Sequence, residues 1–375
     1  MKSSNRAILI MAAATIVLGS FGLFYVMGEM KYDSTIDLTV GTYGEHVYTY
    51  QFDTETLAFT ETGRMNAVDP SYALGVRKAD GEGTDIYAVS EKGGESGVYS
   101  FSDGIVTGEN HQTGDDPCFL MLHGGRYMLT ADYSGGSISV FSLKDRTVQD
   151  MCQKLTFSGS GPVKGRQNSS HIHQVRHVPQ QEEYILATDL GADVIRLVHV
   201  NEAAEENMFT HIEDISCPAG SGPRHMEFSK DGKMLYCLGE LSGEVLAYEI
   251  IREDGKPAFR LKQRILADEV NAGGSADIHI HPSGKWLYTS HRLDNDGIAT
   301  FSIRTDGTLE KIGYNKTARH PRNFMISDDG AFMLVACLND RIIQVFRISD
   351  DGTLALTPSV LRVEKDMPSC VTVIR

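Results

Sequence analysis

The sequence predicts an all-β fold: a seven-bladed β-propeller whose last blade is closed by strands from the N- and C-terminal ends, preceded by one hydrophobic N-terminal helix. Three observations lead to this prediction. They are a repeat of about 45 to 55 residues, glycine-containing turns between alternating apolar segments, and one long apolar run before the repeats begin. The predicted boundaries are residues 1–30 for a signal or anchor segment and residues 31–375 for the propeller.

The repeat is clearest in three segments of the C-terminal half. They are GPRHMEFSKDGKMLYCLGELSGEVLAYEI from Gly222, SADIHIHPSGKWLYTSHRLDNDGIATFSI from Ser275 and HPRNFMISDDGAFMLVACLNDRIIQVFRI from His320. Each contains three short apolar strands, and an Asp-Gly or Ser-Gly turn separates the first strand from the second. Glycine supplies the positive φ that such hairpin turns require. Because a fourth, less regular strand follows each segment, the pattern predicts four-stranded blades.

Weaker copies of the repeat extend this pattern over the chain after residue 31. Seven inner strands are expected to begin near Pro70, Pro117, Ile172, Pro223, Ala276, Pro321 and Pro368. The last start leaves room for only one strand before Arg375. The segment LTVGTYGEHVYTYQFD, from Leu38 to Asp53, can supply the missing strands. A blade made from both ends closes the ring and removes exposed sheet edges.

The composition is that of a folded protein with an acidic surface. The 375 residues include 50 acidic and 35 basic side chains, for a formal charge of −15. This balance disfavours nucleic acid as a partner, because phosphate backbones require a basic face. A locally basic pocket for a small anion remains compatible with it. The six cysteines include no CxxC pair, so we interpret them as buried free thiols rather than as a zinc or redox motif.

Residues 7–27 form an apolar run, AILIMAAATIVLGSFGLFYVM, that follows Lys2 and Arg6. About 20 apolar residues can span a bilayer as a helix. Because no A-x-A-like cleavage site follows, an uncleaved anchor is favoured over a cleaved signal peptide. The preceding positive charges place the remaining chain outside the cytoplasm. The expected localisation is therefore periplasmic or otherwise extracytoplasmic, with inner-membrane contact through this segment only.

Charged and imidazole side chains gather where inner strands are expected to begin and second strands to end. The first set contains Asp69, Asp116, His171, His173, Arg224, His225, Asp277, His279, His320 and Arg322. The second contains Glu91, Asp132, Asp189, Glu240, His291, Arg292 and Asn339. Within it, Glu91, Asp132 and Asp189 are interpreted as turn or capping residues. One such set per blade is unusual for a purely structural channel mouth and indicates a binding or catalytic site.

Several blades resemble, in order, those of the lactonase-family propellers, which include bacterial 6-phosphogluconolactonase and the fungal carboxymuconate-lactonizing enzyme. The matching segments are VGTYGEHVYTYQFD, SHIHQV with ILATDLGADVIRLVHV, GPRHMEF with LYCLGELSGEVLAYEI, SADIHIHPSGKWLYTSHR and HPRNFMISDDGAFMLVA. The resemblance covers residues 38–375 and implies a lactone hydrolase that opens a sugar lactone by attack of water.

The resemblance also implies which residues act. His173, Arg224 and Glu240 are the expected catalytic residues, and His171, His225, Arg292 and Arg322 are expected to bind the substrate. Glu240 and His173 are both candidates for the base that activates water. Arg224 would stabilise the oxyanion, and a second arginine would hold a phosphate or carboxylate of an anionic sugar lactone. This chemistry requires no cofactor, metal or nucleophilic serine.

Other interpretations of the same residues stay open. His171 and His173 lie two positions apart, which suits a metal site, although no third ligand stands at a defined spacing. Arg224 and Glu240 could form a structural ion pair between strands. The alternative functions are a membrane-anchored, non-catalytic propeller that binds a protein or glycan, a lactonizing isomerase, and a metal- or quinone-dependent sugar oxidoreductase.

Overall fold

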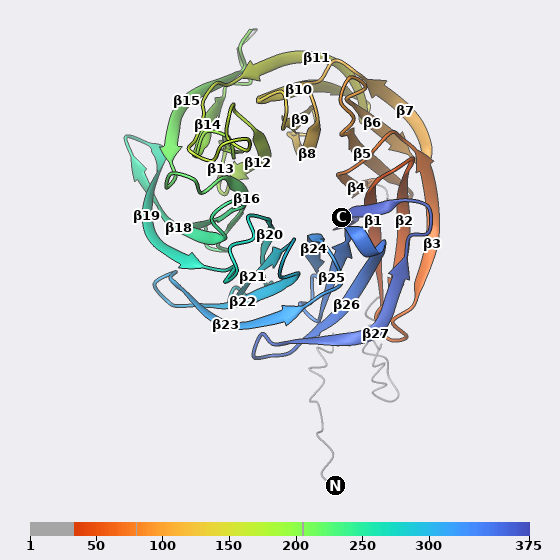
Figure 1. Cartoon of the computed structure of the whole chain (residues 1–375). Coiled ribbons are helices and arrows are strands. Elements are labelled where there is room, and N and C mark those ends of the chain that lie inside the picture. Colours follow the sequence, from red (N-terminus) through yellow and green to blue (C-terminus); the bar gives the residue numbers. More distant parts are fainter. Residues whose placement is uncertain (1–33, 80, 205) are drawn as a thin grey trace, which may run out of the picture.

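The computed structural model describes residues 34–79, 81–204 and 206–375. These residues form seven four-stranded antiparallel sheets arranged as blades around a central axis (Figure 1). The seven-bladed all-β prediction is therefore confirmed. The predicted hydrophobic N-terminal helix and the anchor segment, residues 1–30, lie outside the described residues.

Each blade runs from an inner strand at the axis to an outer strand at the rim. The strands are β1 (Thr35–Tyr43), β2 (His46–Asp53), β3 (Phe59–Asn66), β4 (Ala73–Arg77), β5 (Thr84–Ser90), β6 (Gly97–Ser102), β7 (Ile105–Asn110), β8 (Pro117–His123), β9 (Tyr127–Asp132), β10 (Ser137–Lys144), β11 (Thr147–Thr156), β12 (Ile172–Val178), β13 (Gln181–Asp189), β14 (Val194–Val200), β15 (Phe209–Ser216), β16 (Pro223–Phe228), β17 (Met234–Gly239), β18 (Glu244–Glu253), β19 (Lys256–Leu266), β20 (Ser275–Ile280), β21 (Trp286–His291), β22 (Gly297–Ile303), β23 (Leu309–Lys316), β24 (Pro321–Ile326), β25 (Phe332–Cys337), β26 (Ile342–Ile348), β27 (Leu354–Arg362) and β28 (Met367–Val373). A short 3₁₀ helix, η1 (Leu338–Asp340), follows β25. Within the described ranges, no helix is long and apolar enough to cross a membrane.

The ring is closed as the sequence predicts. The C-terminal strand β28 is the innermost strand of a sheet whose order is β28-β1-β2-β3. It pairs antiparallel with β1, and Val40 lies opposite Val371. The expected inner-strand starts agree with the structure within about three residues, and the largest difference is at Pro70, since β4 begins at Ala73. Closure by both ends leaves no inner strand unpaired on its blade.

The hydrophobic core lies between neighbouring blades rather than in one central mass. Leu186 and Leu197 of one blade pack with Met226, Leu235 and other residues of the next, and all are buried. Apolar residues on both faces of a strand are therefore covered by adjacent sheets. This packing leaves the strand ends free to carry polar groups at the axis.

The glycines of the three clearest repeats occupy the turns for which the sequence pattern required them. Gly232, Gly284 and Gly330 have φ values of +69°, +73° and +74°. A side chain with a β-carbon rarely adopts this left-handed region, so glycine is the residue that closes these hairpins. The turn positions deduced from the sequence are confirmed.

The six cysteines form no disulfide. Four of them are buried, Cys217 is half-buried and Cys152 is exposed. The interpretation as buried free thiols therefore holds for Cys118, Cys237, Cys337 and Cys370 but is wrong for Cys152.

Candidate active site

The expected site residues lie at the end of the propeller where inner strands begin and second strands end. His173, Arg224 and Arg322 stand near the starts of β12, β16 and β24, whereas Glu240 and Arg292 directly follow β17 and β21. Since the first two strands of each blade are antiparallel, both groups of positions fall at the same end of the axis. Six of the seven expected residues come together here, because His225 lines one recess with His173, Arg224 and Arg322.

Glu240 is the centre of a cluster of guanidinium groups. Its carboxylate lies 2.7 Å from Arg224 Nε, 2.5 Å from Arg166 Nη2 and 3.4 Å from Arg292 Nη2. We call these four residues the Glu240 cluster. Burial would raise the pKa of Glu240, but the attraction of Arg292, Arg224 and Arg166 lowers it to about 2. Glu240 therefore stays ionised, and the anticipated ion pair with Arg224 is present.

Two of these arginines are fixed by further contacts. Arg224 donates to the backbone carbonyl of Ala276, and Arg292 Nε donates to the carbonyl of Gly274 at 2.9 Å. Burial lowers the pKa of both guanidinium groups, and Glu240 opposes that shift. Buried charges of this kind persist only when paired. Glu240 is therefore needed to hold Arg224 and Arg292 in place.

A second charged group faces the Glu240 cluster from other blades. Arg322 Nη2 donates to the Tyr43 hydroxyl at 2.6 Å, and Tyr43 donates to Glu91 at 2.7 Å. Arg322 also lies 3.7 Å from the Glu91 carboxylate. Glu91 therefore belongs to the site, and its interpretation as a turn residue is wrong. Asp132 does stabilise the turn between β9 and β10, as expected, because the Ser137 and Ser139 hydroxyls both donate hydrogen bonds to its carboxylate.

His173 is buried beside these cations. Its ring meets the rings of His225 and Tyr133 edge-on, with centroids 5.1 and 5.6 Å apart, and Cys118 Sγ lies 3.7 Å from its Nδ1. Burial, together with the positive charge of Arg224, holds the pKa of His173 well below its usual range. The imidazole is therefore neutral at pH 7. A neutral imidazole can accept a proton.

His171 and His225 are the other two residues expected to bind the substrate, and His225 lines a recess with His173, Arg224 and Arg322. The His171 ring stacks on Tyr133 with centroids 4.4 Å apart, and its Nδ1 contacts the Tyr133 carbonyl at 2.9 Å. His225 Nδ1 contacts Asp277 at 2.7 Å, deeper along the axis. The His225 ring meets that of His173 directly, whereas His171 contacts Tyr133, whose ring in turn meets His173.

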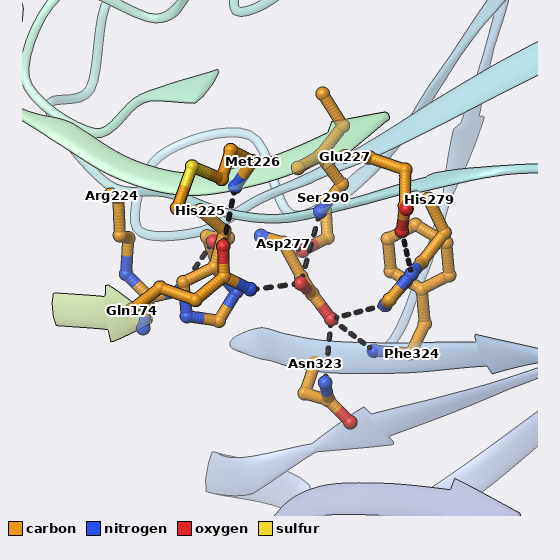
Figure 2. A network of polar contacts seen from close by, with 12 residues as sticks. Gln174, Arg224, His225, Met226, Glu227, Asp277, His279, Ser290, Asn323 and Phe324 are labelled. Atoms are coloured by element: carbon orange, nitrogen blue, oxygen red, sulfur yellow. Dashed lines mark hydrogen bonds and ion pairs between the residues drawn. The ribbon is translucent and has the colours of Figure 1, made fainter. Parts of the chain in front are cut away.

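Figure 2 shows the network that holds His225. Asp277 contacts the rings of His225 and His279, and it accepts a hydrogen bond from Asn323 at 2.5 Å, thereby joining β16, β20 and β24. His279 also contacts Glu227 at 3.2 Å. Burial would lower the pKa of His279, but Asp277 and Glu227 raise it to about 10. The network, including Arg176 beside Glu227, carries two positive and two negative charges and is balanced.

The charges at the mouth are not balanced. Four guanidinium groups, Arg166, Arg224, Arg292 and Arg322, are in contact with two carboxylates, Glu240 and Glu91. His173 and His320 add no charge, because burial and the arginines hold the pKa of His173 well below its usual range and lower that of His320 to about 3. Every arginine of this set contacts a carboxylate, but the positive charges of the set exceed its negative charges by two. An arrangement of this kind attracts an anion.

A large cavity lies deeper along the axis than the arginines. Its volume is about 1010 Å³, and Glu227, His279 and Arg176 are among the residues that line it. A narrow recess lined by His173, Arg224 and Arg322 borders it, and His225 lines both. In the described part of the chain, no group of three His, Cys, Asp or Glu side chains is placed to hold a metal ion.

Sequence reasoning missed Arg166 and Tyr43. Arg166 lies in the connection between β11 and β12, where no strand pattern identifies a position at the axis. Tyr43 ends β1 and meets Arg322 across 279 residues of sequence. For Arg166, the glycine-rich segment GSGPVKGRQ is a signal of a long loop over the mouth, but not of its partner.

Comparison with known proteins gives one family and several close structures. Residues 37–373 match the family model described as lactonase, 7-bladed beta-propeller. A 6-phosphogluconolactonase of Formosa agariphila is 38% identical over 64% of this chain and 69% of its own length. That of Bacillus subtilis is 29% identical over 88% of this chain and 96% of its own length.

Two solved structures extend the likeness to three dimensions. A provisionally assigned 6-phosphogluconolactonase from Bacteroides fragilis is 36% identical, covers 93% of this chain and all of its own, and has a TM-score of 0.85. The periplasmic gluconolactonase of Pseudomonas aeruginosa is 26% identical, covers 91% of this chain and 99% of its own, and has a TM-score of 0.81.

Proposed function

Because this chain belongs to the lactonase family of seven-bladed β-propellers, and is a lactone hydrolase of the 6-phosphogluconolactonase kind, we propose that it opens an anionic sugar lactone by attack of water. The observation that carries the proposal is the excess of two positive charges among the four arginines at the mouth. In a protein whose formal charge is −15, a local excess of this kind favours a substrate with a phosphate or carboxylate.

Ring opening of a lactone passes through a tetrahedral intermediate whose carbonyl oxygen becomes negative. Buried donors aimed at that oxygen stabilise the transition state more than they stabilise the substrate. Arg224 is the donor we assign to this role, because it is 2% exposed and is fixed by Glu240 and Ala276. Arg322 borders the same recess and is assigned to an anionic group of the substrate.

The two candidate bases differ in their electrostatics. A pKa of about 2 makes Glu240 a poor proton acceptor, and three arginines occupy its carboxylate. His173 is neutral and lines the recess with Arg224. A bound anion would offset the repulsion from the arginines and raise the pKa of His173 toward the useful range. We therefore assign the base to His173.

The pH dependence of hydrolysis tests this assignment. Protonation of His173 removes the base, so kcat/KM should fall only as the pH drops through a pKa well below 6.5. With spontaneous hydrolysis subtracted, kcat/KM for 6-phosphogluconolactone should be flat from about pH 6 to 8 and should decline in acid.

The variant His173→Asn provides the control, since its residual rate should lack the acid limb. An acid limb that persists unchanged in this variant would exclude His173 as the base. Absence of any hydrolysis above the spontaneous rate, at every pH, would contradict the proposed function itself.

We further propose that the propeller acts outside the cytoplasm, carried or anchored there by residues 7–27. The apolar run after Lys2 and Arg6 supports this proposal. Its substrate would then be an extracytoplasmic sugar lactone. Cell fractionation tests the localisation, and recovery of the full-length chain in the cytosolic fraction would contradict it.

A further inference from the structure

Arg166 differs from the other arginines of the mouth in exposure. Its side chain is 40% exposed, compared with 2% for Arg224, 7% for Arg292 and 17% for Arg322. It is also the one among these four that comes from a loop between blades rather than from a strand or a strand end. Two buried arginines, Arg224 and Arg292, already neutralise the charge of Glu240, so the contact with Arg166 is not needed for this purpose.

The backbone beneath Arg166 is fixed. The adjacent Gln167 is 1% exposed, and its amide donates to the carbonyl of Leu190 at 2.8 Å and to Asp193 at 2.7 Å. Its side-chain oxygen accepts a hydrogen bond from the Val163 amide at 3.0 Å. Arg166 is therefore a long, half-exposed side chain on a rigid base, and its guanidinium can move while the loop stays in place.

Resting on the proposed function, we propose that Arg166 determines specificity by joining Arg322 in binding the phosphate or carboxylate substituent of the lactone at the mouth. The guanidinium has five donors, and its contacts with Glu240 and with the Tyr133 hydroxyl leave some of them unused. The remaining donors can take a second anion bidentately, either beside Glu240 or after leaving it. Arg292 and Arg224 keep Glu240 paired in both cases.

The test compares Arg166→Ala with Lys164→Ala, an exposed residue of the same loop that loses the same charge. Arg166→Ala should lower kcat/KM for 6-phosphogluconolactone by roughly ten- to a hundredfold, mainly through KM. Its kcat/KM for gluconolactone should stay within about threefold of the wild type. Arg166→Lys should recover part of the loss, because it restores the charge without the bidentate geometry.

Two kinetic outcomes would overturn the assignment. Equal losses on both lactones would mean that Arg166 acts only by positioning Glu240, and no loss on either would mean that it is a surface residue. Calorimetry with 6-phosphogluconate and gluconate separates this proposal from the function, since it needs no turnover. Arg166→Ala should weaken binding of 6-phosphogluconate alone, by about tenfold or more. An unchanged Kd, or no binding of 6-phosphogluconate to the wild type, would contradict the proposal.

Discussion

Replacing Arg224 with alanine is expected to lower kcat for lactone hydrolysis by about 10²- to 10³-fold. Losses of this size follow removal of one oxyanion donor in other hydrolytic sites. Arg224 is 2% exposed, its Nε lies 2.7 Å from Glu240, and it lines the recess together with His173 and Arg322. Because the interaction is expected mainly in the transition state, kcat should fall more than KM rises.

A matched control keeps this result interpretable. Arg264 belongs to the same blade and is paired with Glu244, but its side chain is 51% exposed. Arg264→Ala should leave kcat unchanged. Circular dichroism and a thermal scan of Arg224→Ala would show whether the fold survives. A folded Arg224→Ala variant with wild-type kcat would remove Arg224 from the mechanism.

Replacing Glu240 with alanine is expected to reduce the free energy of unfolding by roughly 3–5 kcal/mol, the usual cost of breaking a buried ion pair. The variant leaves Arg224 and Arg292 buried without their carboxylate, and hydrolysis should be lost as well. Urea unfolding at pH 7 measures the difference. The pKa of Glu240 is lowered from 4.5 to about 2, so its stabilisation is complete above pH 4.5 and is lost as the pH falls toward 2.

Glu244→Ala is the comparison for this prediction. Glu244 pairs at 2.8 Å with Arg264, whose side chain is 51% exposed, and pairs that reach the solvent in this way contribute at most about 1 kcal/mol. If Glu240→Ala were no less stable than Glu244→Ala, the Glu240 cluster would not depend on its carboxylate. That result would contradict the claim that Glu240 holds Arg224 and Arg292 in place.

The architecture could be predicted from the sequence because each blade carries its own signals. The Asp-Gly and Ser-Gly turns at Gly232, Gly284 and Gly330 mark hairpins locally, without knowledge of distant contacts. Closure by β28 followed from counting strands in the last repeat. In repeat architectures each unit packs mainly against its neighbours, so the sequence pattern of single units is enough to predict the fold.

The site was harder to predict, because its chemistry depends on contacts between blades. The strand pattern brought Arg224, Glu240, Arg292 and Arg322 to one end of the axis. It did not reveal that three arginines hold Glu240 ionised, which is why we propose a counterion role for Glu240 instead of that of the base. One of the three arginines, Arg166, lies on a loop without strand periodicity. No spacing rule could therefore have identified its contact with Glu240.

The most direct test of the account is the ratio of kcat/KM for 6-phosphogluconolactone to kcat/KM for gluconolactone, measured with the purified full-length chain and with spontaneous hydrolysis subtracted. An excess of two positive charges at the mouth predicts a preference for the phosphorylated lactone of about tenfold or more, which added salt should weaken. Equal values for the two lactones, or no catalysis of either, would contradict the claim that this site opens anionic sugar lactones.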